Sequence, residues 1–172
     1  MTQPVQMREP GAGEDERIAF VIRRAFGGEA EAQLVADLRK DGDMVREFVA
    51  AHEGDGLIGH VAFSRLALRS AEQTLEAVAL APLAVLPTQQ RRGTGSALVE
   101  HGLTQLREAR IDVAIVLGDP AYYSRFGFSA LLARLLHAPY SGDGFQALEL
   151  KPNALGRRTW TCTYPPAFAT LA

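Results

Sequence analysis

One segment, residues 83–99, constrains the fold more than any other part of the chain. It reads Leu-Ala-Val-Leu-Pro-Thr-Gln-Gln-Arg-Arg-Gly-Thr-Gly-Ser-Ala-Leu-Val. The apolar start predicts the end of a buried strand, Pro87 marks its exit, and the two glycines predict a turn that leads into a helix near Ser96. Such a turn exposes backbone N–H groups and the positive end of a helix dipole. The segment therefore predicts a site for an anion such as phosphate.

Two familiar phosphate-binding motifs do not match this turn. No Gly-Lys-Ser/Thr follows, which excludes a P-loop and argues against ATP, and no third glycine completes a Rossmann fingerprint. Arg91 and Arg92 lie within the turn and suit a pyrophosphate or a ribose 3′-phosphate. Taken alone, the Gly-x-Gly pattern is a weak signal for phosphate, because it more often marks a simple tight turn.

Length and composition bound the remaining possibilities. The 172 residues predict a single domain over 1–172, and the net charge of −2 argues against a nucleic-acid partner. No apolar run is long enough to cross a membrane and no signal peptide is recognisable, so the expected location is cytoplasmic. The single cysteine, Cys162, is expected in the core, and the histidines lack the spacing of metal ligands, so no metal is predicted.

The hydrophobic pattern predicts a mixed α and β chain with a strand–helix–strand unit over residues 77–117. Residues 53–56 predict a hairpin turn. Helices are expected over residues 14–26, 34–42 and 96–110. Strands are expected over residues 5–8, 47–52, 57–64, 77–86, 112–117, 145–150 and 159–164.

A second informative segment, Tyr122-Tyr123-Ser124-Arg125-Phe126-Gly127-Phe128, follows the predicted strand 112–117. Together the two segments resemble the GNAT N-acetyltransferase superfamily. Its acetyl-CoA motif runs Val-x-Pro-x-x-Gln/Arg-x-x-Gly-x-Gly/Ala before a helix, and its second signature is aromatic-Tyr-x-Arg/Lys-x-Gly-Phe. Residues 80–85, 118–123, 144–150 and 164–168 narrow the resemblance to the YhbS-like branch. The residues that match the first motif are Val85, Pro87, Gln90, Gly93 and Gly95.

The resemblance implies a GNAT fold: a mixed, mostly antiparallel twisted sheet of about six or seven strands, flanked by helices, with splayed central strands. It implies an N-acetyltransferase that uses acetyl-CoA and a small-molecule or peptide amine, as a monomer or homodimer. Residues 83–85 would lie along the pantetheine arm, and the loop with the helix start would hold the pyrophosphate. The implied cofactor-binding residues are Leu83, Ala84, Val85, Gln90, Arg91, Arg92, Gly93, Thr94, Gly95 and Ser96.

Tyr123 matches the position of the family's general acid, which protonates the departing CoA thiolate. A tyrosine is protonated at neutral pH and can act in this way, although a ring that merely covers the core explains the same residue. Relatives commonly carry an asparagine and a longer helix before this tyrosine. Here Gly118-Asp119-Pro120 shortens the approach, and Asp119 is expected to cap the short helix.

The acceptor side is less defined by the sequence. The central strand carries one acid, Glu76, at its start. Glu29 and Glu31 are candidates for the acceptor cleft, although a solvated helix start explains them equally well. His60 and Ser64 share one face of their strand, where a structural histidine is the simpler interpretation. These features leave open an alternative function, an acyl-CoA sensor or interaction module without turnover.

Overall fold

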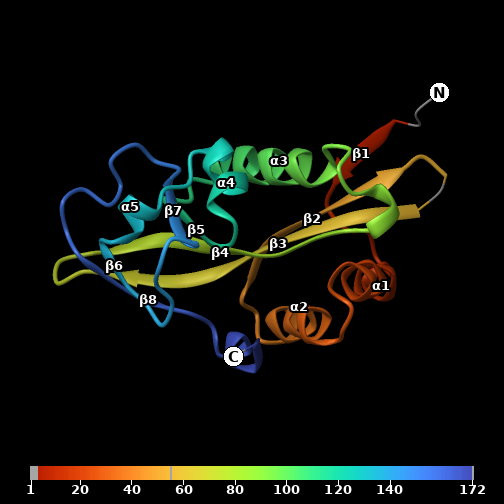
Figure 1. The fold of residues 1–172 in the computed structure, drawn as a ribbon. Helices are drawn as coiled ribbons and strands as arrows, with labels where there is room; N and C mark the ends of the chain where they lie inside the picture. The colour runs from red at the N-terminus through yellow and green to blue at the C-terminus, as the bar shows by residue number, and fades with distance from the viewer. Residues whose placement is uncertain (1–3, 55, 172) are drawn as a thin grey trace.

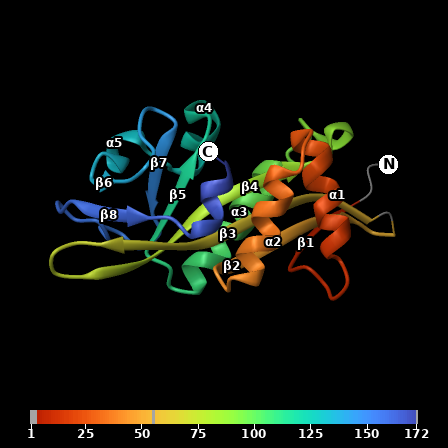
Figure 2. The ribbon, with the colours of Figure 1, turned by 90° about the horizontal axis from the view of Figure 1, so that it is seen from below.

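A twisted sheet separates two layers of helices in the computed structural model, which describes residues 4–54 and 56–171 (Figure 1). α3 and α4 lie above the sheet, whereas α1, α2 and the C-terminal η3 lie below it, as the view from below also shows (Figure 2). The helices are α1 (Asp15–Phe26), α2 (Ala30–Lys40), η1 (Pro87–Gln89), α3 (Thr94–Glu108), α4 (Pro120–Tyr123), η2 (Ser124–Phe126), α5 (Ala130–Ala133) and η3 (Pro166–Leu171).

Within the described residues the sheet has eight strands. The main path runs β1-β2-β3-β4-β5-β7, while β8 pairs with β3 and β6 pairs with β8. The β4–β5 and β6–β8 pairs are parallel and the others are antiparallel, which confirms the mixed, mostly antiparallel sheet. The strands are β1 (Val5–Arg8), β2 (Met44–His52), β3 (Gly56–Arg69), β4 (Thr74–Val85), β5 (Val113–Leu117), β6 (Leu136–His137), β7 (Phe145–Glu149) and β8 (Trp160–Thr163).

The sequence predicted these strands except β6, which at two residues is too short to show an alternating pattern. The predicted turn at residues 53–56 connects β2 to β3, although Asp55 lies outside the described residues. The predicted third helix begins at Thr94, earlier than expected, because the turn closes directly on Gly93.

The central strands β4 and β5 separate partway along their lengths. Their last paired residues are Leu80 and Val116. Beyond this point β4 stays paired with β3 as far as Val85 opposite Gly59, whereas β5 continues along β7. One edge of residues 81–85 therefore has no strand partner in the described chain, which confirms the splayed central strands.

Alternating residues of the long strands fill two cores, one on each face of the sheet. On β3, Phe63 packs toward α3 with Leu98, whereas Ala62 packs toward α1 with Ile18 and Ile22. The central strands are thus covered on both faces, as the continuous apolar pattern of residues 77–86 predicts. This packing on both faces fixes the sheet at the point where the ends of β4 and β5 separate.

Candidate active site

A cavity of about 580 Å³ lies between the unpaired edge of β4 and the start of α3. Strand, loop and helix all contribute to it, together with the short helices that follow β5. It is therefore assembled from both segments that the sequence singled out. The lining residues are Leu83, Val85, Gln89, Gln90, Arg91, Gly93, Gly95, Ser96, Tyr122 and Arg125.

The loop between β4 and α3 is shaped to expose the helix start. The Gln90 side chain donates a hydrogen bond from Nε2 to the Val85 carbonyl at 3.0 Å, which ties the loop back to the strand end. Gly93 has a φ of 84° and sits directly before α3, and among the described side chains none caps that helix. Since a Cβ at Gly93 would meet nothing within 4 Å, this left-handed backbone, rather than crowding, favours glycine. The first amide groups of α3 are thus available to an anion.

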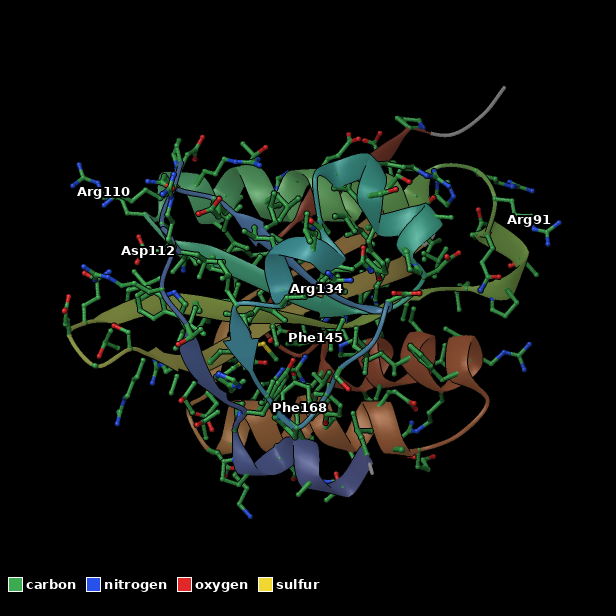
Figure 3. The ribbon with its side chains drawn as sticks, turned by 60° about the vertical axis from the view of Figure 1, so that its left-hand side comes forward. Arg91, Arg110, Asp112, Arg134, Phe145 and Phe168 are labelled. Carbon is green, nitrogen blue, oxygen red and sulfur yellow. The ribbon has the colours of Figure 1, made fainter. Side chains whose placement is uncertain are left out.

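Positive charge surrounds this helix start. Arg91 lines the cavity and projects outward at its rim (Figure 3). Arg125 lies on η2, with its guanidinium carbon 4.7 Å from the centre of the Tyr122 ring. Arg92 is exposed and does not line the cavity. Two arginines and a helix dipole beside one cavity can bind a phosphate group.

Seven of the ten predicted cofactor-binding residues line the cavity, and Ala84, Arg92 and Thr94 do not. Ala84 is 1% exposed, and its side chain packs into the core beneath α1. This is the consequence of strand alternation, which turns Leu83 and Val85 the other way. Only the main chain of Ala84 can therefore contact a ligand on the free edge. The Thr94 side chain is buried at the first turn of α3.

The two adjacent tyrosines have different surroundings. Tyr122 lines the cavity, and its hydroxyl lies 3.3 Å from the Ser96 hydroxyl. Tyr123 packs edge-on against Phe128, with ring centres 5.8 Å apart. Burial, followed by the charge of Tyr122, raises the pKa of Tyr123 to about 12. The sequence analysis singled out Tyr123 and missed Tyr122, although neighbouring residues on a helical turn must point in different directions.

The Tyr123 ring stands beside the split in the sheet. It lies against the backbone of Gly118, where an added Cβ would come within 2.5 Å of its Cε2 atom. Gly118 is the second residue after Val116, the last residue of β5 that pairs with β4. The approach to the tyrosines is fixed by Asp119, whose Oδ1 accepts a hydrogen bond from the Ala121 amide at 3.0 Å. Asp119 is thus the helix cap that the sequence predicted.

His60 belongs to a partly buried ionic network on the face of the sheet opposite α3. Its Nε2 donates to Glu47 at 2.9 Å, and Arg39 donates to the same carboxylate at 2.7 and 2.9 Å. Burial lowers the pKa of His60, which is therefore neutral at pH 7. Although burial opposes its ionisation, hydrogen bonds from Arg39 and His60 hold the pKa of Glu47 at about 2. The structural interpretation of His60 is thus confirmed.

The other candidates for the acceptor cleft lie in three different surroundings. Ser64 is buried, and its hydroxyl has no hydrogen-bond partner among the described residues. Glu29 forms an ion pair with Arg23 at 2.8 Å. Glu31 lines a second hollow beside the split between β4 and β5. Of the two acids, the structure therefore brings only Glu31 to the strand ends.

Two kinds of feature are absent from the part of the chain that the structure describes. The described residues contain no cluster of three or more His, Cys, Asp or Glu side chains arranged to hold a metal ion. None of the helices in residues 4–54 and 56–171 combines the length and the apolar character needed to cross a membrane.

Comparison with known proteins identifies the family. Residues 6–131 match the family described as "Acetyltransferase (GNAT) domain". The "Uncharacterized N-acetyltransferase YhbS" of Escherichia coli strain K12 is 37% identical over 153 residues, which cover 88% of this chain and 90% of that protein.

Solved structures agree with the sequence match. The crystal structure of the GNAT family N-acetyltransferase YhbS from Escherichia coli in complex with CoA has a TM-score of 0.89 and 34% identity, and covers 98% of this chain and 94% of its own. A GNAT family acetyltransferase from Brucella melitensis in complex with acetyl-CoA has a TM-score of 0.79 and 30% identity, covering 97% and 99%. The chain therefore belongs to the GNAT family of N-acetyltransferases, in the branch that contains YhbS.

Proposed function

We propose that the protein transfers the acetyl group of acetyl-CoA to a primary amine by direct attack of the amine on the thioester. One observation carries the proposal: a single cavity joins the unpaired edge of β4 to the uncapped, positively charged start of α3. An extended pantetheine arm can add to a free strand edge while a pyrophosphate binds the helix start. The CoA and acetyl-CoA complexes of the two relatives support this use of the cavity.

Two groups of residues around the cavity suit two parts of the cofactor, its pantetheine arm and its phosphates. Leu83, Ala84 and Val85 offer main-chain groups to the pantetheine amides. The loop and the helix start offer amides and arginine side chains to the phosphates, and Gln90 holds the loop in place through its bond to Val85. The loop and helix residues proposed for this role are Gln90, Arg91, Arg92, Gly93, Thr94, Gly95 and Ser96.

Tyr123 is the proposed proton donor to the departing sulfur. When the amine nitrogen bonds to the acyl carbon, the C–S bond breaks and the sulfur takes the electron pair. With its pKa raised to about 12, Tyr123 keeps its proton at every pH at which the enzyme works. This pKa makes the Tyr123 hydroxyl a weaker acid than an ordinary thiol. The same burial disfavours a thiolate at this place, which raises the proton affinity of the sulfur and narrows the difference as charge develops on it.

A covalent intermediate on cysteine is not part of the proposal. Cys162 is 3% exposed, and burial raises the pKa of its thiol to about 12, so it is not a thiolate at neutral pH. Direct attack requires the amine to lose its proton, which solvent or a nearby carboxylate can accept.

Two single-hydroxyl variants test the mechanism. Tyr123→Phe is expected to lower kcat by roughly 10²–10⁴-fold, the usual contribution of a general acid, with the affinity for acetyl-CoA unchanged. Tyr122→Phe, the matched control, removes the contact with Ser96 in the cavity and is expected to weaken acetyl-CoA binding while kcat is retained. The reverse pattern would assign the proton donation to Tyr122 and overturn the proposed role of Tyr123.

Calorimetric titration of acetyl-CoA into wild type and Gly93→Glu tests the cavity itself. A carboxylate at the helix start repels phosphate, so the variant is expected to lose binding while its circular dichroism spectrum is unchanged. Tight binding without acetylation of any amine would favour the alternative, an acyl-CoA sensor. That alternative draws on one feature of β4, whose only acid, Glu76, lies far from the split.

A further inference from the structure

A second hollow lies on the face of the sheet opposite α3. Its volume is about 270 Å³, slightly below the roughly 300–1,000 Å³ usual for ligand pockets, so it suits a small ligand. The separating ends of β4 and β5, the helices α2 and η3, and the segments before β7 and after β8 surround it. Figure 3 shows Phe168 on the side of η3 that faces the sheet. The lining residues that matter are Glu31, Ala81, Leu117, Tyr140, Tyr164 and Phe168.

This hollow and the cofactor cavity reach β4 at neighbouring positions beside its split from β5, from opposite faces of the sheet. The hollow reaches β4 at Ala81, and the cofactor cavity reaches the same strand at Leu83. Two residues of chain span at most about 7 Å. A nitrogen held in the hollow therefore lies within reach of an acyl group held along the free edge of β4.

Aromatic and aliphatic side chains make up most of the wall. The ring centres of Tyr140 and Tyr164 are 4.9 Å apart, and those of Tyr164 and Phe168 are 5.1 Å apart, both in edge-to-face contact. Leu117, at the end of β5, is 53% exposed at the rim. Such a wall favours a flat or branched apolar group and offers few partners to the hydroxyl groups of a sugar.

Glu31 is the one charged residue among those that line the hollow. It is half-buried, and no hydrogen bond or ion pair engages its carboxylate within the described part of the chain. The neighbouring acid Glu29 is instead paired with Arg23. An unpaired carboxylate at the edge of an apolar hollow favours one cation on a ligand whose remaining surface is apolar.

We propose that this hollow binds the acceptor, and that the acceptor is a small primary amine carrying one aryl or branched alkyl group. Glu31 attracts the ammonium group, and the rings of Tyr140, Tyr164 and Phe168 receive the apolar body. The inference rests on the proposed function, since the amine is acetylated only if acetyl-CoA occupies the neighbouring cavity. It excludes amino sugars and linear polyamines as preferred acceptors, because neither carries an apolar body that matches this wall.

Competition between amines tests the substrate class. Release of CoA thiol is measured with phenethylamine, isoamylamine, putrescine and glucosamine, and the acetylated products are identified by mass. Phenethylamine and isoamylamine are expected to have kcat/KM values at least about tenfold above the two polar amines, as burial of one apolar group predicts. Equal or higher values for putrescine or glucosamine would overturn the inference while leaving the proposed function intact.

Paired variants test the residues. Glu31→Gln is expected to raise the KM for phenethylamine about tenfold, since the ammonium loses its charged partner, with the KM for acetyl-CoA unchanged. Glu29→Gln is the matched control and is expected to behave as wild type. Leu117→Ser changes an exposed rim residue without disturbing the core, and is expected to reduce the preference for phenethylamine over putrescine. Wild-type behaviour of both Glu31→Gln and Leu117→Ser would overturn the assignment of the hollow.

Calorimetry provides a readout that does not depend on turnover. Phenethylamine is titrated into the protein saturated with CoA, and binding is expected in wild type and Glu29→Gln but to be at least about tenfold weaker in Glu31→Gln. Phenethylamine binding without acetylation of any amine would refute the proposed function and leave the hollow as an amine site. Absence of phenethylamine binding, or equal binding in both variants, would refute the hollow as that site.

Discussion

Replacing Gly118 by alanine tests whether the position of the Tyr123 ring controls the chemistry. The added Cβ would lie 2.5 Å from Cε2 and 3.0 Å from Cδ2 of Tyr123. Since carbon atoms in contact are about 3.5–4.0 Å apart, the ring must move by about 1 Å. A displacement of about 1 Å can reduce a rate roughly 100-fold. We therefore expect kcat to fall roughly 100-fold, and overpacking to cost about 1–3 kcal/mol of stability.

The assay combines steady-state CoA release with thermal melting. The KM for acetyl-CoA is expected to change little, because Tyr122 and not Tyr123 lines the cofactor cavity. Gly28→Ala is the matched control, since a Cβ there meets nothing within 4 Å and its φ lies outside the left-handed region. The double variant Gly118→Ala with Tyr123→Phe is expected to be no slower than Tyr123→Phe alone, because both changes act on one group. A folded Gly118→Ala enzyme with wild-type kcat would refute the reasoning.

Three further outcomes are expected. The pKa of Glu47 is about 2 in the folded protein and about 4.3 unfolded, so its stabilising contribution is complete above that unfolded value and is lost as the pH falls through about 2. Urea unfolding of Glu47→Gln should show a loss of roughly 1–3 kcal/mol at pH 7, since Arg39 and His60 lose the charged acceptor of their hydrogen bonds, and a smaller acid-induced loss than wild type. Gln90→Ala should raise the KM for acetyl-CoA about 2–10-fold with kcat unchanged, because the loop loses its bond to Val85. The thiol of Cys162, 3% exposed, should react with an aromatic disulfide reagent only when urea unfolds the protein.

Much of the fold could be predicted because its signals are local and strong. β4 is buried on both faces, so it appears in the sequence as one apolar run, and Gly27 stops α1 with a φ of 79°. β6 could not be predicted, because two residues carry no periodicity and the strand is defined by its pairing with β8. The start of α3 at Thr94 depends on backbone geometry at Gly93, which a hydrophobic pattern does not report.

The cofactor cavity and the second hollow also differ in how far the sequence could predict them. The cofactor cavity draws most of its lining from one continuous stretch, so a motif could identify it before the fold was known. The second hollow draws its lining from six elements or segments, and only packing brings Glu31, Leu117 and Phe168 together. The sequence indicated Glu31 through its position at a helix start. It indicated Tyr164 and Phe168 only as part of the family resemblance, with nothing to show that they line a hollow.

The ionic network of Arg39, Glu47 and His60 lies on the same face of the sheet as the second hollow and helps to fix the shape of that hollow. Arg39 lies in the last turn of α2, Glu47 on β2 and His60 on β3, so their hydrogen bonds join the helix to two strands. Burying a charged pair gains less stability than apolar packing would, yet its directional bonds fix one orientation. Since α2 also carries Glu31 at its first turn and packs against Phe168 through Leu34 and Leu38, that orientation sets where the carboxylate stands relative to the strand ends. The network thus affects the second hollow through the direction of α2, whereas the lining of the cofactor cavity comes from β4, the loop that follows it, α3, α4 and η2.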